Sequence, residues 1–374
     1  MNLRPLRVGL AGYGSFARFL QKSWSSLEGV QIVAAASLHD APENIRTYEH
    51  WDGLLTDKEV DLVAIITPPN LHAAIASAVM EAGKHVLIEK PVATALADAR
   101  RLLEIRDRTG RVATIDFLMR FTPLAEIFAS WKRDLPFGRL RRAAIENHAQ
   151  DETLPTGHWF WDIAQSGGIL VEHGGHFFDL IGSFTSARPV RVDRWAYRRP
   201  NGAQDRTLAT VCYDDGLTFT QYHTFSRPFF FERTTTQLWY DLAELELEGW
   251  FPLSGRIRAL TNAATEPALA MLPHFTEMSR RPVPQSGGAL PPPITIGGEP
   301  FSASDEIVGT FDIRRPKMDI YADAVRAMLV DVRRAIDDPA HQLRVTLEAG
   351  VEALRLAVEE TGAASAEARM PPPP

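Results

Sequence analysis

Short apolar runs alternate with stretches of helical periodicity over the first third of the chain. Apolar runs of this kind are typical of strands buried on both faces, and their alternation with helices predicts a parallel sheet with crossover helices. The strands are expected at Arg7–Ala11, Gln31–Ala36, Leu62–Thr67, His85–Ile88 and Val112–Asp116.

One β-α-β unit in this region has both helix ends marked in the sequence. Asn70 is the expected N-cap of a helix that follows the third strand, and Gly83 is its expected end. The apolar residues predicted to share one face of this helix are Leu71, Ile75, Ala78 and Val79.

After about Pro123 the pattern changes to alternating apolar and polar residues, which predicts an antiparallel sheet. The runs are Arg142–Asn147, Thr207–Tyr213, Leu217–His223, Thr234–Tyr240 and Leu242–Glu248. Asp215-Gly216 lies between two of them and predicts a hairpin, because glycine can adopt the positive φ of a primed turn.

The last part of the chain begins with a segment rich in Pro, Gly and Ser, Pro282–Lys317, which we expect to be an excursion rather than a core element. Two helices are predicted after it, one over Tyr321–Ile336 and one starting near Thr346. Met370–Pro374 cannot continue a helix and is expected to be an extended tail.

A length of 374 residues exceeds what one hydrophobic core usually spans, so two domains are expected. The change of pattern places the boundary near residue 123. The predicted fold class is α/β followed by α+β, with a Rossmann dinucleotide-binding domain over residues 1–123 and a second domain over residues 124–374.

Composition and charge narrow the class of partner. Hydrophobic residues are 45% of the chain and charged residues 23%, and the net charge of -7 argues against nucleic acid or an anionic membrane as a partner. No apolar run approaches the ~20 residues of a membrane span, and the N-terminus lacks a signal-peptide pattern. Cys212 is the single cysteine, expected to be a small buried side chain, and a cytoplasmic location is predicted.

A glycine-rich turn follows the first predicted strand. Gly12-Tyr13-Gly14-Ser15-Phe16-Ala17 fits G-x-G-x-x-G/A at the start of a helix. Gly12 permits the tight turn, Gly14 lets the backbone approach a pyrophosphate, and Ala17 allows close helix–sheet packing. The free N–H groups of the helix N-terminus, at Ser15 and Phe16, would face the anion. We therefore expect NAD or NADP as the cofactor.

The end of the second strand does not decide between these two cofactors. Ser37 could bond a ribose hydroxyl or a 2′-phosphate, His39 could add positive charge, and Asp40 could take the acidic role typical of NAD sites. The choice between NAD and NADP stays open at this point.

Two motifs follow later strands, where parallel sheets place their ligands. The first motif contains Thr67, Pro68, Asn70 and His72, and the second is Glu89-Lys90-Pro91. The candidate cofactor contacts are the four residues of the first motif together with Glu89 and Lys90. The Lys90 ammonium could also stabilise a developing alkoxide. The alternative is a solvated lysine, with Asn70 only a helix cap and His72 a partly buried helix residue.

A third motif lies far downstream, in a helix predicted over Ile169–Phe184. Glu172 and His176 are then i and i+4 and share a face, with Asp179 three residues further on. His176 is a candidate general base, since the ordinary pKa of histidine is about 6.5 and a neighbouring carboxylate raises or tunes it. The rival is a metal site that uses His173 and His176 with Glu172, joined by His148 or His158. Glu172 and His173 are adjacent and diverge on a helix, however, and no metal is expected.

Together these motifs resemble the glucose–fructose oxidoreductase, inositol dehydrogenase and rhizopine-catabolism (Gfo/Idh/MocA) family. The resemblance rests on GYGSFA, TPPNLH, EKP and GGILVEHGGHFFD in family order and spacing. It implies a Rossmann domain followed by a domain built on a large, mostly antiparallel open sheet, whose outer face forms contacts in a homo-oligomer, a dimer or tetramer. The family's lysine, acid and histidine fall on Lys90, Glu172 and His176.

The sequence departs from the family pattern at two places. Glu172 stands where the family usually has Asp, so the carboxylate reaches one methylene further. The segment His39–Thr47 is shorter than usual, which removes material near the adenosine ribose. Both departures bear on substrate and cofactor choice.

The resemblance implies an NAD(P)-dependent oxidoreductase that moves a hydride to or from a carbinol carbon of a sugar or polyol. His176 would accept the hydroxyl proton, Lys90 would steady the alkoxide, and Glu172 would orient His176 or hold a neighbouring hydroxyl. The candidate substrate contacts are Arg120, His158, Trp159, Trp161 and Asp179. The alternatives are a redox-neutral sugar-modifying enzyme with tightly bound NAD, and a nonenzymatic dinucleotide-binding regulator.

Overall fold

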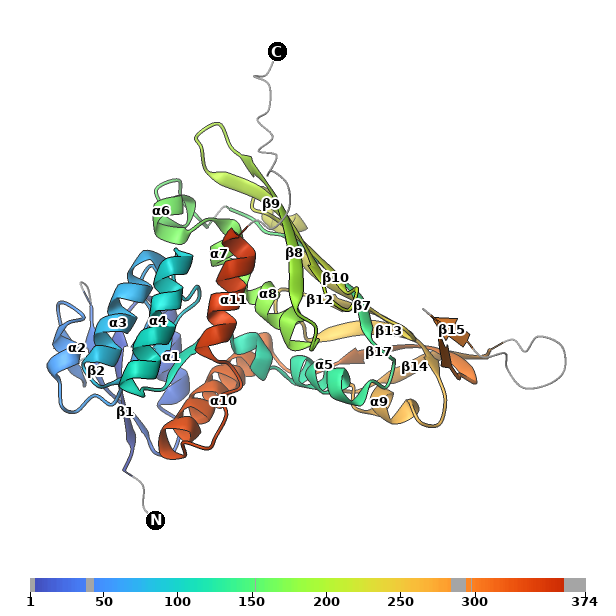
Figure 1. Ribbon diagram of the computed structural model, residues 1–374, viewed down its shortest axis with the longest axis horizontal. Helices are drawn as coiled ribbons and strands as arrows, with labels where there is room; N and C mark the ends of the chain where they lie inside the picture. The colour runs from blue at the N-terminus through green and yellow to red at the C-terminus, as the bar shows by residue number, and fades with distance from the viewer. Residues whose placement is uncertain (1–3, 38–43, 152, 284–293, 297, 360–374) are drawn as a thin grey trace.

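The computed structural model describes residues 4–37, 44–151, 153–283, 294–296 and 298–359. Two sheets dominate it, a compact one near the N-terminus and a broad, extended one that spans the rest of the molecule (Figure 1). His39, Asp40 and the predicted tail Met370–Pro374 lie outside the described residues. None of the described helices has the length and apolar character to cross a bilayer.

The N-terminal sheet has six parallel strands in the order β3-β2-β1-β4-β5-β6. Its strands are β1 (Leu6–Ala11), β2 (Val30–Ala36), β3 (Arg46–Tyr48), β4 (Leu62–Ile65), β5 (His85–Ile88) and β6 (Ala113–Ile115). Helices α1 (Ser15–Trp24), α2 (Gly53–Thr56), α3 (His72–Glu81) and α4 (Leu96–Thr109) connect them. Five strands are confirmed, β5 with its predicted ends and the others with ends shifted by at most two residues. Strand β3 is an addition that the pattern did not predict.

The start of helix α3 differs from the prediction. A 3-10 turn, η1 (Pro69–Leu71), precedes it, and the helix begins at His72 without a side-chain cap. Asn70 is exposed and Leu71 is 40% exposed, so neither the predicted cap nor the first residue of the predicted apolar face is correct. The proline at the first position of the turn sets φ for the entry, and the helix starts one residue later than predicted. Gly83, with φ of 79°, ends this region as expected.

The second sheet has nine strands in the order β14-β17-β13-β12-β11-β7-β10-β9-β8, antiparallel except where β7 meets β10. Its strands are β7 (Leu140–His148), β8 (Pro189–Arg198), β9 (Gln204–Tyr213), β10 (Thr218–Thr224), β11 (Arg233–Tyr240), β12 (Ala243–Glu248), β13 (Ser254–Thr261), β14 (Thr276–Pro282) and β17 (Asp305–Asp312). The five predicted runs are all strands, and Gly216, with φ of 89°, closes the predicted hairpin between β9 and β10. Cys212 on β9 is only partly buried, contrary to expectation.

The segment Pro282–Lys317 is not merely an excursion. Strand β17 lies inside it, between β13 and β14, and buries Ile307 and Phe311 in the core. The pair β15 (Ile294–Ile296) and β16 (Glu299–Phe301) forms a separate hairpin. The alternation of β17 is short, and its Pro- and Gly-rich flanks obscured it in the sequence.

Helices cover one side of the large sheet and lie between it and the N-terminal sheet (Figure 1). The two predicted C-terminal helices are confirmed as α10 (Lys317–Asp337) and α11 (Leu347–Val358). Trp24 in α1 donates its indole N–H to the Val325 carbonyl of α10 at 2.9 Å, which ties the last helices to the first sheet. The remaining helical elements are η2 (Leu118–Phe121), α5 (Pro123–Asp134), η3 (Trp159–Trp161), α6 (Ile163–Ser166), α7 (Ile169–Glu172), α8 (Gly175–Ser183), η4 (Phe229–Phe231) and α9 (Glu266–Ala270).

The helix predicted over Ile169–Phe184 is broken into α7 and α8 at His173 and Gly174. The Gly174 N–H bonds the Ile169 carbonyl at 2.9 Å, one residue beyond the helical partner. A Cβ on Gly174 would lie 2.8 Å from the Leu170 carbonyl oxygen, so the close turn depends on glycine. The break changes the direction of the chain between Glu172 and His176, which therefore do not follow simple i, i+4 geometry.

Candidate functional site

The glycine-rich turn lies between β1 and α1 and has the geometry that its sequence predicts. Gly12 has φ of 99°, and a Cβ there would lie 2.3 Å from the Ile66 carbonyl oxygen, so only glycine fits. A Cβ on Gly14 would meet no atom of the described residues within 4 Å. Helix α1 begins at Ser15 without a side-chain cap, and Ala17 is fully buried. The turn therefore leaves open space in front of uncapped N–H groups, which suits a pyrophosphate.

A cavity of about 370 Å³ opens beside this turn and brings together elements from both sheets. Three of the predicted cofactor motifs contribute to it, and so do segments more than 80 residues further along the chain. Its lining residues are Gly14, Ser15, Phe16, Ile66, Thr67, Pro68, Pro69, Glu89, Lys90, Leu118, Trp159, Glu172, His176, Trp250 and Tyr321.

The three candidate catalytic residues converge on this cavity. The Lys90 ammonium, at the end of β5, forms an ion pair with the Glu172 carboxylate of α7 and donates to the Glu172 carbonyl oxygen at 3.0 Å. Their side chains are 16% and 11% exposed, so the pair is held at the cavity wall. His176 in α8 is 4% exposed and stands edge-on to the Trp250 ring, with ring centroids 5.3 Å apart.

The carboxylate expected to tune His176 binds Lys90 instead. Burial, the positive charge of Lys90 and the interaction with the neighbouring His173 hold the pKa of His176 well below its usual value. Burial and Lys90 also lower the pKa of His173 to about 3, where its ring packs against His223 and Phe225. Both imidazoles are therefore neutral near pH 7, and His176 Nδ1 has no hydrogen-bond partner among the described residues.

The remaining predicted cofactor contacts divide into two groups. Thr67 and Pro68 line the cavity, and Glu89 lines it while accepting the Lys90 N–H at 3.0 Å. Asn70 is exposed and outside the lining. His72 is buried, and its ring nitrogens lie 2.7 Å from the Pro91 carbonyl and 2.8 Å from that of Thr67, so it ties the two motif loops together.

Ser37 lies at the end of β2, where its N–H bonds the Tyr48 carbonyl at 2.9 Å. This places Ser37 beyond the carboxyl end of the strand next to β1, as predicted, but outside the cavity lining. His39, the other candidate at this edge, lies outside the described residues.

Of the five candidate substrate contacts, only Trp159 lines the cavity. Arg120 donates through Nε to Asp179 at 2.8 Å, and neither residue lines the cavity. The Asp179 side chain is 1% exposed. His158 Nδ1 accepts the Phe160 N–H at 3.2 Å and caps η3. The Arg199 guanidinium covers the Trp161 ring at 4.5 Å. Four of the five thus have partners within the protein itself.

Two aromatic lining residues were not predicted as site residues. Trp250 follows β12 and Tyr321 begins the apolar stripe of α10, where the pattern indicated only a core position. The Lys317 ammonium lies 5.8 Å from the centre of the Trp250 ring. No motif surrounds either residue, and only the packing of α10 against α1 brings Tyr321 to the glycine-rich turn.

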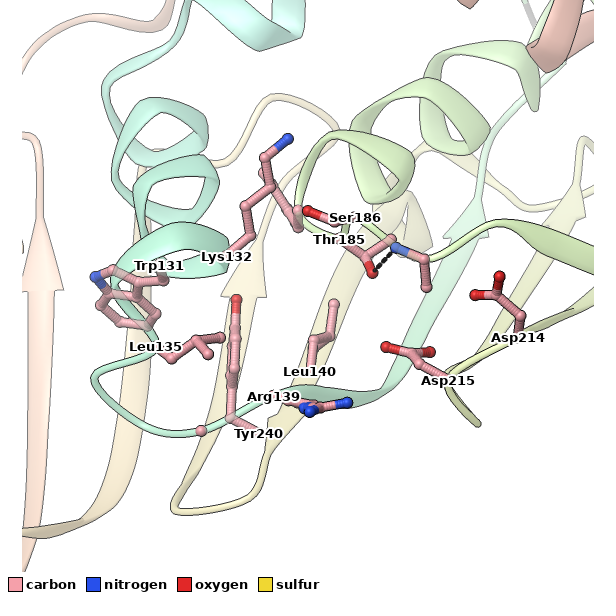
Figure 2. Close-up of a pocket in the computed structure, with 13 residues that line it drawn as sticks. Trp131, Lys132, Leu135, Arg139, Leu140, Thr185, Ser186, Asp214, Asp215 and Tyr240 are labelled. Atoms are coloured by element: carbon pink, nitrogen blue, oxygen red, sulfur yellow. Dashed lines mark hydrogen bonds between the residues drawn. The ribbon is translucent and has the colours of Figure 1, made fainter.

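Cavities of similar size lie elsewhere, including one of about 500 Å³ lined by residues of β12, β13, β14 and β17, but these cavities do not contain the predicted motifs. The described residues contain no group of three His, Cys, Asp or Glu side chains that could hold a metal ion. Figure 2 shows a separate cavity of about 350 Å³ between α5, α8 and the β9–β10 hairpin. There Asp214 pairs with Arg188 and Asp215 accepts the Leu217 N–H, so its acidic groups already have partners.

Comparisons with known proteins agree with this geometry. A family model described as "Oxidoreductase family, NAD-binding Rossmann fold" matches residues 6–117, and the GFO/IDH/MocA C-terminal domain matches residues 134–236. Levoglucosan dehydrogenase from Pseudarthrobacter phenanthrenivorans is 26% identical over 57% of this chain and 61% of its own length. An uncharacterized oxidoreductase, ORF334, from Rhizobium meliloti is 32% identical over 55% of this chain and 64% of its own length. The matches thus span about three-fifths of these two relatives.

Solved structures support the fold over almost the whole chain. An oxidoreductase domain protein from Kribbella flavida has a TM-score of 0.73 at 18% identity, covering 95% of this chain and 96% of that one. Aldose-aldose oxidoreductase from Caulobacter crescentus, complexed with glycerol, has a TM-score of 0.70 at 19% identity, covering 94% and 95%. The two matched family models, with the glycine-rich turn and the two-sheet fold, establish that this chain belongs to the Gfo/Idh/MocA oxidoreductase family.

Proposed function

We propose that this protein is an NAD(P)-dependent oxidoreductase that transfers a hydride between nicotinamide and a carbinol or carbonyl carbon of a sugar, polyol or related small molecule. The convergence of Lys90, Glu172 and His176 on a cavity beside the glycine-rich turn carries the proposal. Relatives named as a levoglucosan dehydrogenase and an aldose-aldose oxidoreductase support the substrate class.

The residues present fit a dinucleotide. The open space at Gly14 and the uncapped start of α1 would receive the pyrophosphate. The buried Thr67 hydroxyl lines the cavity and has no hydrogen-bond partner among the described residues, so it is available to a ligand. When bound, the nicotinamide supplies a carbon that accepts or donates the hydride.

Lys90 would stabilise negative charge on the substrate oxygen. Its ammonium already contacts the Glu172 carboxylate and carbonyl, which fixes the direction of the side chain. A lysine ammonium has three N–H groups, so one remains for a substrate hydroxyl or carbonyl oxygen. Held in this way, the ammonium stabilises a developing alkoxide without reorganising.

His176 would accept the hydroxyl proton during oxidation and return it during reduction. Its neutral ring is in the correct protonation state to act as a base near pH 7, because burial holds its pKa low. The Glu172 carboxylate would act through Lys90, as a positioning residue, rather than through His176.

A panel of polyols and keto-sugars, assayed with NAD and NADP in both directions by the absorbance of the reduced nicotinamide, tests the proposal. Lys90→Met and His176→Asn should each lower turnover by at least about a hundredfold, within the usual range for general acid–base groups. Lys132→Met, at the separate cavity, is the matched control and should retain activity. Substrate conversion without net change in reduced nicotinamide would instead indicate a redox-neutral reaction, and failure of both cofactors to bind would refute the proposal.

We also propose a homo-oligomer formed through the outer face of the large sheet. In Figure 1 helices α5, α8 and α11 lie on one side of this sheet only. The other side presents Leu208, which is 40% exposed, and the partly exposed ring of Trp195, paired with it across β8 and β9. Light scattering on the purified protein should give a dimer or tetramer mass, and Leu208→Glu should reduce it. A monomer in the unaltered protein would contradict this assembly.

A further inference from the structure

Two carboxyl groups meet beneath the cavity, at the ends of neighbouring strands. Glu89 follows β5 and Asp116 follows β6, and the register of these strands places Ile88 beside Ile115. Asp116 is completely buried, whereas Glu89 also lines the cavity. The negative charge of Asp116 acts on Glu89 and raises its pKa, so the two side chains lie close together, and neither Asp116 carboxyl oxygen has a hydrogen-bond partner among the described residues. Two buried carboxyl groups this close together hold one proton between them, because two adjacent buried negative charges repel each other.

No cation neutralises this pair directly. Within the described part of the chain neither Glu89 nor Asp116 takes part in an ion pair, because the nearest ammonium, that of Lys90, is turned to Glu172. The cluster of Lys90, Glu172 and the singly protonated pair therefore has a net charge of one negative unit. This excess charge faces a cavity rather than a protein cation.

The other ionisable groups around the pair are neutral. The Tyr321 phenol of α10 lies close to both carboxyl groups, and burial with their negative charge raises its pKa. His72 of α3, like His176 of α8, has its pKa lowered by burial. Burial raises the pKa of Asp116 to about 6, and burial followed by the negative charge of Asp116 raises that of Glu89 well above its usual range.

We propose that the Glu89–Asp116 pair is the counter-charge for the oxidised nicotinamide, so that the protein binds the cationic oxidised cofactor in preference to the neutral reduced form. The inference rests on the proposed function, which places the nicotinamide beside Lys90. One shared negative charge in a buried site stabilises a nearby cation and has little effect on a neutral ring. The role belongs to the pair, because Asp116 lines no part of the cavity and acts through Glu89.

The preference depends on pH in a defined direction. Below about pH 6 the second carboxyl takes up a proton, so the pair becomes neutral and the counter-charge is lost. As the pH is lowered further, the affinity for the oxidised cofactor falls by up to about tenfold per pH unit, while the affinity for the reduced cofactor changes little. Binding of the oxidised form in this range releases a proton from the pair to the solvent.

Tryptophan fluorescence provides the test without any substrate, since Trp159 and Trp250 line the cavity. Dissociation constants for oxidised and reduced cofactor are measured between about pH 5 and pH 8. The unaltered protein should favour the oxidised form increasingly up to about pH 6, with proton release detected by calorimetry in buffers of different ionisation enthalpy. A ratio of the two constants that is independent of pH, without proton release, would overturn the inference.

Two variants assign the effect to the pair. Glu89→Gln with Asp116→Asn should remove both the preference and its pH dependence, while the reduced cofactor still binds. Asp116→Asn alone leaves the Glu89 carboxylate as the single negative charge, so the preference should persist at neutral pH, and the midpoint of its titration should change because the coupling between the two carboxyl groups is lost. Variants that keep the unaltered ratio and midpoint would refute the assignment. Failure of the unaltered protein to bind either cofactor would instead refute the proposed function.

Discussion

Replacing Gly14 with alanine separates the nucleotide-binding role of the turn from its role in folding. Gly14 has φ of -78° and ψ of -168°, which any residue adopts, and an added Cβ meets no described atom within 4 Å. The free energy of unfolding should therefore stay within about 1 kcal/mol of the unaltered value, with a small gain from the stiffer unfolded chain. The methyl group would occupy the space assigned to the pyrophosphate, so cofactor affinity should fall by at least about tenfold, or ~1.4 kcal/mol.

Gly12→Ala is the matched comparison within the same turn. The new Cβ would lie 2.3 Å from the Ile66 carbonyl oxygen in a residue with φ of 99°. Backbone strain of about 1–3 kcal/mol and overpacking of similar size predict a loss of stability of about 2–5 kcal/mol. Urea unfolding measures stability, and fluorescence titration measures cofactor affinity. If Gly14→Ala binds cofactor as tightly as the unaltered protein, the pyrophosphate does not occupy this turn and the reasoning is wrong.

Three further predictions concern the residues around the cavity. Glu172→Gln keeps a hydrogen-bond acceptor for Lys90 but removes the negative charge, so kcat/KM should fall by about five- to tenfold. This loss is far smaller than the one expected for Lys90→Met. Equal losses in the two variants would mean that Glu172 itself takes part in the reaction. Arg120→Met leaves the buried Asp179 without its partner, so the free energy of unfolding should fall by about 3 kcal/mol while KM stays unchanged. A large rise in KM in the folded variant would instead support the predicted substrate-binding role of Arg120. The pKa of His173 is lowered to about 3, so the unfolded chain binds more protons than the folded protein as the pH falls from about 6.5, and the folded state is destabilised. The His173→Phe variant should therefore lose less stability between pH 7 and pH 5 than the unaltered protein, as measured by urea unfolding. An unchanged pH dependence would contradict the lowered pKa.

The sequence predicted those features that depend on local chemistry. Gly12 and Gly14 follow a strand and precede a helix. The tight turn requires glycine at the first position and the approach of a pyrophosphate requires it at the second, so the turn could be located without a structure. Lys90 could be predicted as a site residue because it follows a parallel strand, and the carboxyl ends of parallel strands meet at the same edge of the sheet, where ligands bind. Five strands of the large sheet could be predicted because each buries one face, which produces alternating apolar and polar residues along the strand.

Features set by tertiary packing could not be predicted. Tyr321 reaches the cavity only because α10 packs on α1, and its sequence neighbours mark it as an ordinary core position. Glu172 was assigned to His176 because a continuous helix was assumed, whereas the turn at Gly174 directs its carboxylate to Lys90. Asp116 was predicted as the end of a strand, and only the pairing of β5 with β6 brings it to Glu89. Arg120 and Asp179 were assigned to the substrate pocket from the family resemblance, and in the structure each is the partner of the other.

Transfer of deuterium from substrate to cofactor is the most direct test of hydride transfer at this site. The most active alcohol of the panel would be labelled at its carbinol carbon, and the reduced cofactor analysed by mass spectrometry after turnover. Direct transfer predicts one deuterium in each reduced nicotinamide formed, with turnover suppressed in Lys90→Met and His176→Asn. Reduced cofactor that carries no deuterium, or undiminished turnover in both variants, would contradict the account.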